Sequence, residues 1–239
     1  MPNDPSPYDL NLDKGPANYT PLSPLSFLKR SAFVYPAKTA VIHGNRRYSY
    51  EEFYGRCRRL ASSLNISGVK QGDTVAILAP NVPELLEAHY GVPMLGAVLN
   101  AINIRLDAPT VAFILEHGNA KVLIADTQFQ EVITAAIATM DNPPFVIDID
   151  DVQGQGGACI GNVEYEAFIA AGDKDYAWSL PDDEWQSISL SYTSGTTGNP
   201  KGVVYDHRGA YLNAIGNAMT FGLNDTSVYL WTLPMFHCN

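Results

Sequence analysis

Eleven consecutive residues, 192–202 (YTSGTTGNPKG), combine hydroxyl side chains, glycines and a single cation. Glycines let backbone N–H groups approach an anion closely, and hydroxyl groups add neutral hydrogen-bond donors. Pro200 fixes its own φ angle and stiffens the backbone before Lys201. An ammonium group about 4 Å from a phosphate oxygen contributes about 4 kcal/mol of attraction at an effective dielectric of roughly 20. These residue types therefore predict a binding loop for a polyphosphate. The hydroxyl side chains are those of Thr193, Ser194, Thr196 and Thr197.

Two familiar phosphate-binding motifs do not match this segment. A Walker-type loop requires a lysine directly after a glycine and a hydroxyl residue next. Here Lys201 follows Pro200 and precedes Gly202, which disfavours a P-loop phosphotransferase. A G-x-G-x-x-G dinucleotide fingerprint is also absent around the segment. A Ser/Thr/Gly-rich linker is the alternative without function, but a linker has no need to lie between two periodic strands.

The segments on either side of the loop place it at the end of a strand. Residues 187–192 alternate apolar and serine side chains, which predicts a strand buried on one face. Residues 202–205 (GVVY) predict a second short strand, and residues 207–222 predict a helix. Because α/β folds usually bind ligands where sheet strands end, the loop occupies a plausible binding position.

The remaining chain alternates helical and strand patterns. Ser49 and Glu52 form a predicted capping box at the start of a helix over residues 49–64. Another helix is predicted from Pro83, interrupted or kinked at Pro93. Alternating strands and helices imply parallel βαβ units, so we predict an α/β fold with a sheet wrapped by helices on both faces. The further predicted helices are 109–118, 127–140 and 164–172, and the strands are 73–79, 120–126 and 144–150.

The predicted organisation is one incomplete domain with an extended arm. Residues 1–24 are polar and rich in proline, which predicts an extended N-terminal arm. Residues 25–239 then form a single domain, because no internal repeat or second linker is visible.

The charge balance excludes one class of partner. A formal net charge of −10 argues against nucleic acid, whose binding depends on clustered basic residues. The local basic cluster Arg56, Arg58 and Arg59 lies on a helix with Glu51 and Glu52, and we interpret it as a solvated helix face.

Cysteine usage and hydropathy predict a compartment. Cys57, Cys159 and Cys238 are far apart and odd in number, which fits neither a disulfide framework nor a zinc site. No secretory pattern is present, and no apolar run approaches the roughly 20 residues that span a bilayer. We therefore predict a cytoplasmic protein without a membrane span. The sequence does not indicate an oligomeric state.

Several motifs resemble one family, the AMP-forming acyl-CoA synthetases of the adenylate-forming superfamily. Residues 192–202 resemble its phosphate-binding signature, and residues 233–237 (LPMFH) resemble its next signature. Residues 72–103 and 103–126 are also similar, so the resemblance covers nearly the whole chain from about residue 22. Residues 89–107 and 229–239 most resemble the branch that acts on short- and medium-chain fatty acids and related small acids.

The resemblance implies a two-step ligase that uses ATP, coenzyme A and Mg²⁺. A carboxylic acid attacks the α-phosphate of ATP to give an acyl-adenylate, and the thiol of coenzyme A then displaces AMP. This activity implies a role in fatty-acid and lipid metabolism. His237 matches a histidine near the acyl carboxylate and is the candidate catalytic residue, although a lone histidine after an apolar strand is more often a packing residue. The implied nucleotide-binding residues are Thr193, Ser194, Gly195, Thr196, Thr197, Gly198 and Lys201.

The sequence also departs from this family. Family members run to more than twice 239 residues, and the stretches that stack adenine, hold magnesium, bind ribose and form the mobile C-terminal domain have no counterpart here. No metal ligand is therefore assigned. We expect an N-terminal fragment of a ligase, with an incomplete sheet and no activity by itself. A non-catalytic nucleotide- or phosphate-binding module is the alternative. Octanoate-like, butyrate-like, aryl and sulfur-containing acids all remain open as substrates.

Overall fold

The computed structural model describes residues 6–193 and 199–237, in which a mostly parallel sheet forms the centre. Its strands lie in the order β7-β6-β5-β3-β4-β8-β9. Only β9 runs antiparallel to its neighbour within the described sheet. The predicted α/β fold is confirmed. The strands are β3 (Thr74–Leu78), β4 (Val98–Ala101), β5 (Ala120–Asp126), β6 (Phe145–Ile149), β7 (Val163–Glu164), β8 (Ser187–Tyr192) and β9 (Gly202–Asp206).

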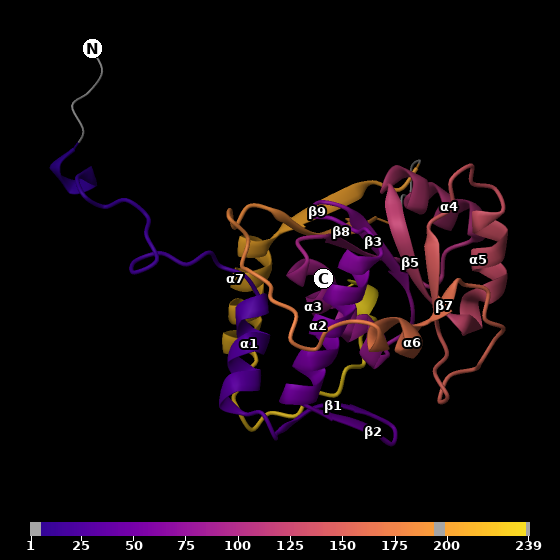
Figure 1. Ribbon diagram of the computed structural model, residues 1–239, viewed down its shortest axis with the longest axis horizontal. Coiled ribbons are helices and arrows are strands. Elements are labelled where there is room, and N and C mark those ends of the chain that lie inside the picture. The colour runs from indigo at the N-terminus through magenta and orange to yellow at the C-terminus, as the bar shows by residue number, and fades with distance from the viewer. Residues whose placement is uncertain (1–5, 194–198, 238–239) are drawn as a thin grey trace, which may run out of the picture.

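Helices cover both faces of this sheet, as Figure 1 shows. Helices α2 (Tyr50–Ile66), α3 (Pro83–Met94) and α6 (Tyr165–Ala170) cover one face. Helices α4 (Ala108–His117) and α5 (Gln130–Ile137) cover the other. The crossovers between parallel strands require this arrangement, because each one returns the chain to the same edge of the sheet.

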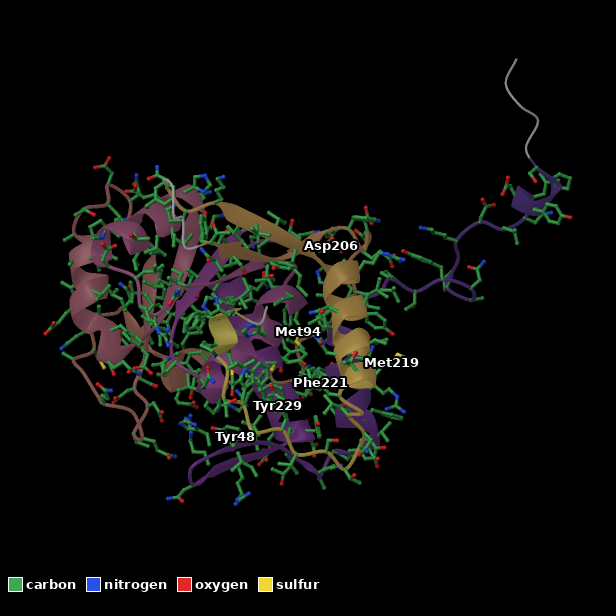
Figure 2. All side chains as sticks on the ribbon, turned by 180° about the vertical axis from the view of Figure 1, so that it is seen from behind. Tyr48, Met94, Asp206, Met219, Phe221 and Tyr229 are labelled. Carbon is green, nitrogen blue, oxygen red and sulfur yellow. The ribbon has the colours of Figure 1, made fainter. Side chains whose placement is uncertain are left out.

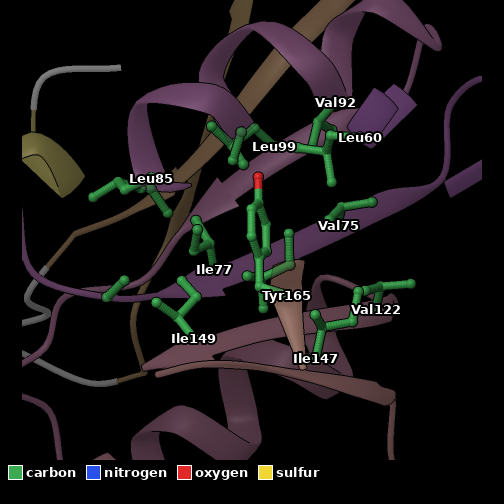
Figure 3. Packing of buried hydrophobic residues seen from close by; sticks show 14 of the residues in the cluster. Leu60, Val75, Ile77, Leu85, Val92, Leu99, Val122, Ile147, Ile149 and Tyr165 are labelled. Atoms are coloured by element: carbon green, nitrogen blue, oxygen red, sulfur yellow. The ribbon is translucent and has the colours of Figure 1, made fainter. Parts of the chain in front are cut away.

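The central strand β3 shows why both faces are covered. Its five residues are all buried. Val75 and Ile77 belong to the core beneath α2 and α3, whereas Ala76 and Leu78 belong to the core beneath α4 and α5. Figure 3 shows the first of these cores, with the ring of Tyr165 among the side chains of the sheet and the helices. Four of its five residues are apolar, and such a strand is typical of a parallel sheet that is buried on both sides.

Local sequence signals set the ends of two helices. Helix α2 begins with the predicted capping box, in which Ser49 Oγ accepts from Glu52 N at 3.2 Å and Glu52 Oε2 accepts from Ser49 N at 2.7 Å. Helix α3 begins at Pro83 as predicted and ends at Met94, one residue after Pro93. Proline lacks the N–H that would continue the helical hydrogen bonds, so the chain turns there towards β4.

Several short elements are absent from the sequence-based description. Helix α1 (Leu25–Val34) follows the proline-rich arm and lies beside α7 (His207–Thr220), where the rings of Phe27 and Tyr211 stack at 4.6 Å. Strands β1 (Thr39–His43) and β2 (Arg46–Ser49) form a separate hairpin. The described part of the arm extends away from the sheet and contains one turn of 3-10 helix, Pro7–Asp9 (Figure 1).

The end of the chain after β8 exposes much apolar surface. Strand β9 forms one edge of the sheet, and its side chains Val203, Val204 and Tyr205 are exposed. Figure 2 shows Met219, Phe221 and Tyr229 farther along, and these side chains are exposed as well. The edge strand and the region after it therefore lack the cover that the other strands receive from helices.

The arginine cluster of α2 is not a solvated face, so that interpretation is wrong. The guanidinium of Arg56 forms two hydrogen bonds with the carboxylate of Glu87, which is completely buried on α3. Tyr165 O–H donates to the same carboxylate at 2.8 Å, and Arg56 also binds Glu166. These side chains join α2, α3 and α6 into one layer.

Replacing Arg56 should destabilise this layer strongly. Arg56→Ala leaves Glu87 buried without its cation, and breaking a buried ion pair on one side typically costs about 3–5 kcal/mol. Urea unfolding followed by circular dichroism should show the loss as a lower midpoint. Arg30→Ala is the matched control, because Arg30 is exposed on α1. Equal midpoints for the two variants would contradict a structural role for Arg56.

His207 should make stability depend on pH. Its ring is buried at the start of α7, Nδ1 lies 2.9 Å from Ser23 Oγ, and burial lowers its pKa from 6.5 to about 4. Between these two pH values His207 binds more protons in the unfolded chain than in the folded one. Its contribution to the free energy of unfolding is therefore fully present above pH 6.5 and is lost as the pH falls towards 4. The free energy of unfolding, measured from pH 4 to 6.5, should rise with pH, and His207→Gln should reduce this slope. An unchanged slope in the variant would refute the lowered pKa of His207.

Candidate functional site

The predicted phosphate loop joins β8 to β9 as the connection of a hairpin. Thr193 N donates to Lys201 O at 3.0 Å, and Lys201 N donates to Thr193 Oγ1 at 3.3 Å. The preceding pair in the ladder is Tyr192 with Gly202. Thr193 and Lys201, at the two ends of the loop, therefore face each other. Ser194, Gly195, Thr196, Thr197 and Gly198 lie outside the described residues.

This hairpin lies at the edge of the sheet where ligands usually bind. Strand β8 is parallel to β4, so it ends on the same edge as the carboxyl ends of β3, β4, β5 and β6. The chain passes from β3 to β4 on one side and then to β5 on the other. In open α/β sheets, ligands usually bind outside the carboxyl ends of the strands near such a reversal of strand order. The side chains of Thr193 and Lys201 are both exposed at this edge, and Lys201 forms no ion pair with any described residue.

Tyr192 fixes the hairpin to a neighbouring helix. Its hydroxyl group lies 2.7 Å from Nδ1 of His117 at the end of α4, and the two rings meet edge to face at 5.7 Å. Phe113 stacks on the other side of His117 at 5.3 Å. Partial burial raises the pKa of Tyr192, so its hydroxyl stays protonated at neutral pH. The sequence-based reasoning did not identify His117, because 75 positions separate it from Tyr192.

His237 lies on a different element from the loop. It ends the 3-10 turn Met235–His237, in which Met235 and Phe236 are buried and His237 is exposed. The ring of Phe236 contacts the ring of His237 at 4.5 Å between centroids. Among the described residues no hydrogen bond joins His237 to Thr193 or Lys201. The exposed imidazole on an apolar anchor is compatible with a group that contacts substrate.

Asn81 holds the segment that leads to His237. It follows β3 at the carboxyl edge, and its Nδ2 donates to Trp231 O at 3.3 Å and to Leu233 O at 2.8 Å. Its Oδ1 accepts from Met235 N at 2.8 Å. Sequence reasoning missed this residue, because its partners lie 150 or more positions later in the chain. Strands β3 and β8 are separated only by β4, so their ends lie about 10 Å apart at the usual strand spacing.

The groups at this edge fit a phosphate better than a metal ion. The ammonium of Lys201 and the hydroxyl of Thr193 are an ordinary donor set for phosphate oxygens. Among the described residues no group of three or more histidine, cysteine or acidic side chains is arranged to hold a metal ion. In the described part of the chain, no helix combines the length and apolar character needed to cross a membrane.

Comparison with protein families and curated proteins gives one consistent result. Residues 28–239 match the family described as AMP-binding enzyme. The chain is 51% identical over 241 residues to an acetate/butyrate–CoA ligase, AAE7, of Arabidopsis thaliana, covering 96% of this chain and 42% of that protein. It is 48% identical to the acetate–CoA ligase CCL3 of Humulus lupulus, with the same coverage. The chain thus spans less than half the length of these relatives.

Solved structures support the fold. The inhibitor-bound N-terminal domain of FACL13 from Mycobacterium tuberculosis is 30% identical, with a TM-score of 0.72 over 90% of this chain and 52% of that one. A long-chain-fatty-acid–CoA ligase, FadD1, from Archaeoglobus fulgidus has a TM-score of 0.77 at 22% identity, covering 92% of this chain and 43% of that one, and shows the shared fold alone.

The predicted cytoplasmic location is contradicted. The Arabidopsis relative above and a trans-cinnamate:CoA ligase of Petunia hybrida, 44% identical over 95% of this chain and 43% of that protein, are both named as peroxisomal. The prediction rested on scattered cysteines and on the lack of a secretory pattern. These properties do not distinguish the cytosol from a peroxisome, because a peroxisomal address is a short receptor-read signal that leaves composition unchanged.

Proposed function

The chain belongs to the AMP-binding enzyme family of acyl-CoA ligases, and we propose that it supplies the phosphate-binding part of an ATP-dependent acyl-CoA synthetase for small carboxylic acids. The observation that carries the proposal is the hairpin at the carboxyl edge of the sheet, where Thr193 and Lys201 face each other. In the same proposal, residues 1–24 are an arm and residues 25–239 are part of one domain.

The proposed reaction needs positive charge and donors around the phosphates of ATP. An oxygen of the acid carboxylate attacks the α-phosphorus, the bond to the bridging oxygen of the β-phosphate breaks, and pyrophosphate leaves with the bonding electrons. The thiolate of coenzyme A then attacks the acyl carbon, and AMP leaves. Lys201 would balance charge on the β- and γ-phosphates and on the departing pyrophosphate, and Thr193 would donate a hydrogen bond. Loop residues 194–198 would add donors.

The acid would bind near the second element of the site. His237 is proposed to contact its carboxylate, since this imidazole is exposed and Asn81, after β3, binds Met235 N two residues before it. Magnesium, when bound, would offset negative charge on the phosphates, and no described residue is assigned as its ligand. The names of two relatives support a small acid: acetate and butyrate at 51% identity and acetate at 48%. A relative at 44% is named for trans-cinnamate, so an aryl acid is the alternative substrate.

A chimaera tests this function directly. Residues 22–239 replace the matching part of the Arabidopsis relative, and acid-dependent ATP–pyrophosphate exchange is measured with acetate, butyrate and octanoate. We expect exchange with at least one of these acids. Lys201→Ala should lower kcat/KM for ATP about 10- to 150-fold, because a hydrogen bond to a charged group contributes roughly 1.5–3 kcal/mol.

The control variant and a binding measurement decide between the outcomes. Lys174→Ala removes an exposed lysine from the loop after α6 and should leave exchange unchanged. Calorimetric titration of the 239-residue chain with ATP measures binding independently of catalysis. A folded chimaera that binds ATP without exchange would replace the ligase proposal with the non-catalytic phosphate-binding module. Equal effects of the two lysine variants would remove the role given to Lys201.

A further inference from the structure

One carboxamide holds the backbone that leads to His237. The side chain of Asn81 forms hydrogen bonds with the backbones of Trp231, Leu233 and Met235, which lie 150, 152 and 154 positions later. This part of the chain belongs to neither described sheet. Its backbone carbonyls therefore accept no hydrogen bonds from a neighbouring strand, and the side chain of Asn81 provides hydrogen bonds in place of that strand.

The spacing of the three partners explains why an asparagine suits this position. The three partner atoms, Trp231 O, Leu233 O and Met235 N, belong to alternate residues, and all three lie within hydrogen-bond distance of the one carboxamide. A carboxamide has the donors and the acceptor of a peptide group. Asn81 uses both of its N–H donors and one lone pair of its oxygen, so no other side chain of similar size offers the same set.

Apolar packing anchors the same segment but does not define its register. Met235 and Phe236 are buried in the core that also contains Val82 and Leu85, and Trp231 packs against that core. Burial of apolar surface is non-directional and tolerates small shifts along the chain. A shift of one residue along the chain would break the hydrogen bonds with the two carbonyl groups and the N–H, because each bond depends on distance and direction.

We propose that Asn81 is a positioning residue that sets the place of His237 at the carboxyl edge of the sheet. The proposal deepens the ligase function and rests on it. Asn81 does not contact the acid in this proposal. It determines where the imidazole stands relative to the hairpin of Thr193 and Lys201, and thus how the carboxylate is held for attack on ATP.

Two variants of Asn81 and one control separate positioning from general stability. Asn81→Ala removes all three hydrogen bonds, whereas Asn81→Asp keeps the acceptor for Met235 N and loses both donors. Asn162→Ala is the matched control, because Asn162 Oδ1 also accepts from a backbone N–H, that of Val146, at 2.9 Å. Val146 lies on β6, three strands from β4 in the order of the sheet and far from β8. All variants are made in the 239-residue chain and in the chimaera.

The first measurement is amide hydrogen exchange by nuclear magnetic resonance in the 239-residue chain. Exchange at Met235 should accelerate about tenfold in Asn81→Ala, as expected for the loss of one hydrogen bond, and should change little in Asn81→Asp and Asn162→Ala. Unchanged exchange at Met235 in Asn81→Ala would overturn the proposal, because the side chain of Asn81 would then not hold residues 231–235 in place.

The second measurement is steady-state exchange kinetics in the chimaera. In both Asn81 variants, KM for the acid should rise about tenfold or more, while KM for ATP stays within about twofold. A parallel rise in both constants, or the same rise in Asn162→Ala, would overturn the positioning role. If the unsubstituted chimaera shows no exchange, the ligase function fails and the positioning role fails with it. The exchange rate of the Met235 amide would still show separately whether Asn81 holds residues 231–235.

Discussion

Burial of β3 on both of its faces is the constraint on which the other elements depend. Each of its five residues is buried, because helices cover both sides and the strand pairs with β4 from Thr74 to Ile77 and with β5 from Thr74 to Leu78. This fixes where the carboxyl ends of the strands lie. Asn81 lies three residues after the end of β3, and only β4 separates β3 from β8, so both parts of the candidate site take their position from this strand.

Local signals in the sequence predicted most of the elements around β3. The capping box of Ser49 and Glu52, the start of α3 at Pro83 and the alternation of β8 all depend on neighbours within a few positions. Strand β4 gave no such signal, because it has only four residues and includes the buried polar Asn100. Its place is set by pairing with β3 and β8, which no short window contains.

The chemistry of the candidate site stays a prediction from residue types, and the residues that support the site were not visible in the sequence. The types and order of residues 192–202 indicated a phosphate loop, and Lys201 was identified from that pattern. Arg56 was misread, because its partner Glu87 lies 31 positions away on another helix. His117 and Asn81 were missed for the same reason. Contacts between distant segments arise from the packing of the sheet, so a pattern of residue types contains no record of them.

Two separate anchors hold the two ends of the proposed reaction centre. The hairpin with Thr193 and Lys201 is fixed to α4 through Tyr192 and His117, while the segment of His237 is fixed to the end of β3. Because each anchor belongs to a different element, the distance between phosphate and carboxylate depends on the spacing across β3, β4 and β8. A packed parallel sheet resists changes in this spacing. The rigidity that aligns two anions in such a site would then come from the core, and the exposed loop would supply only the donors.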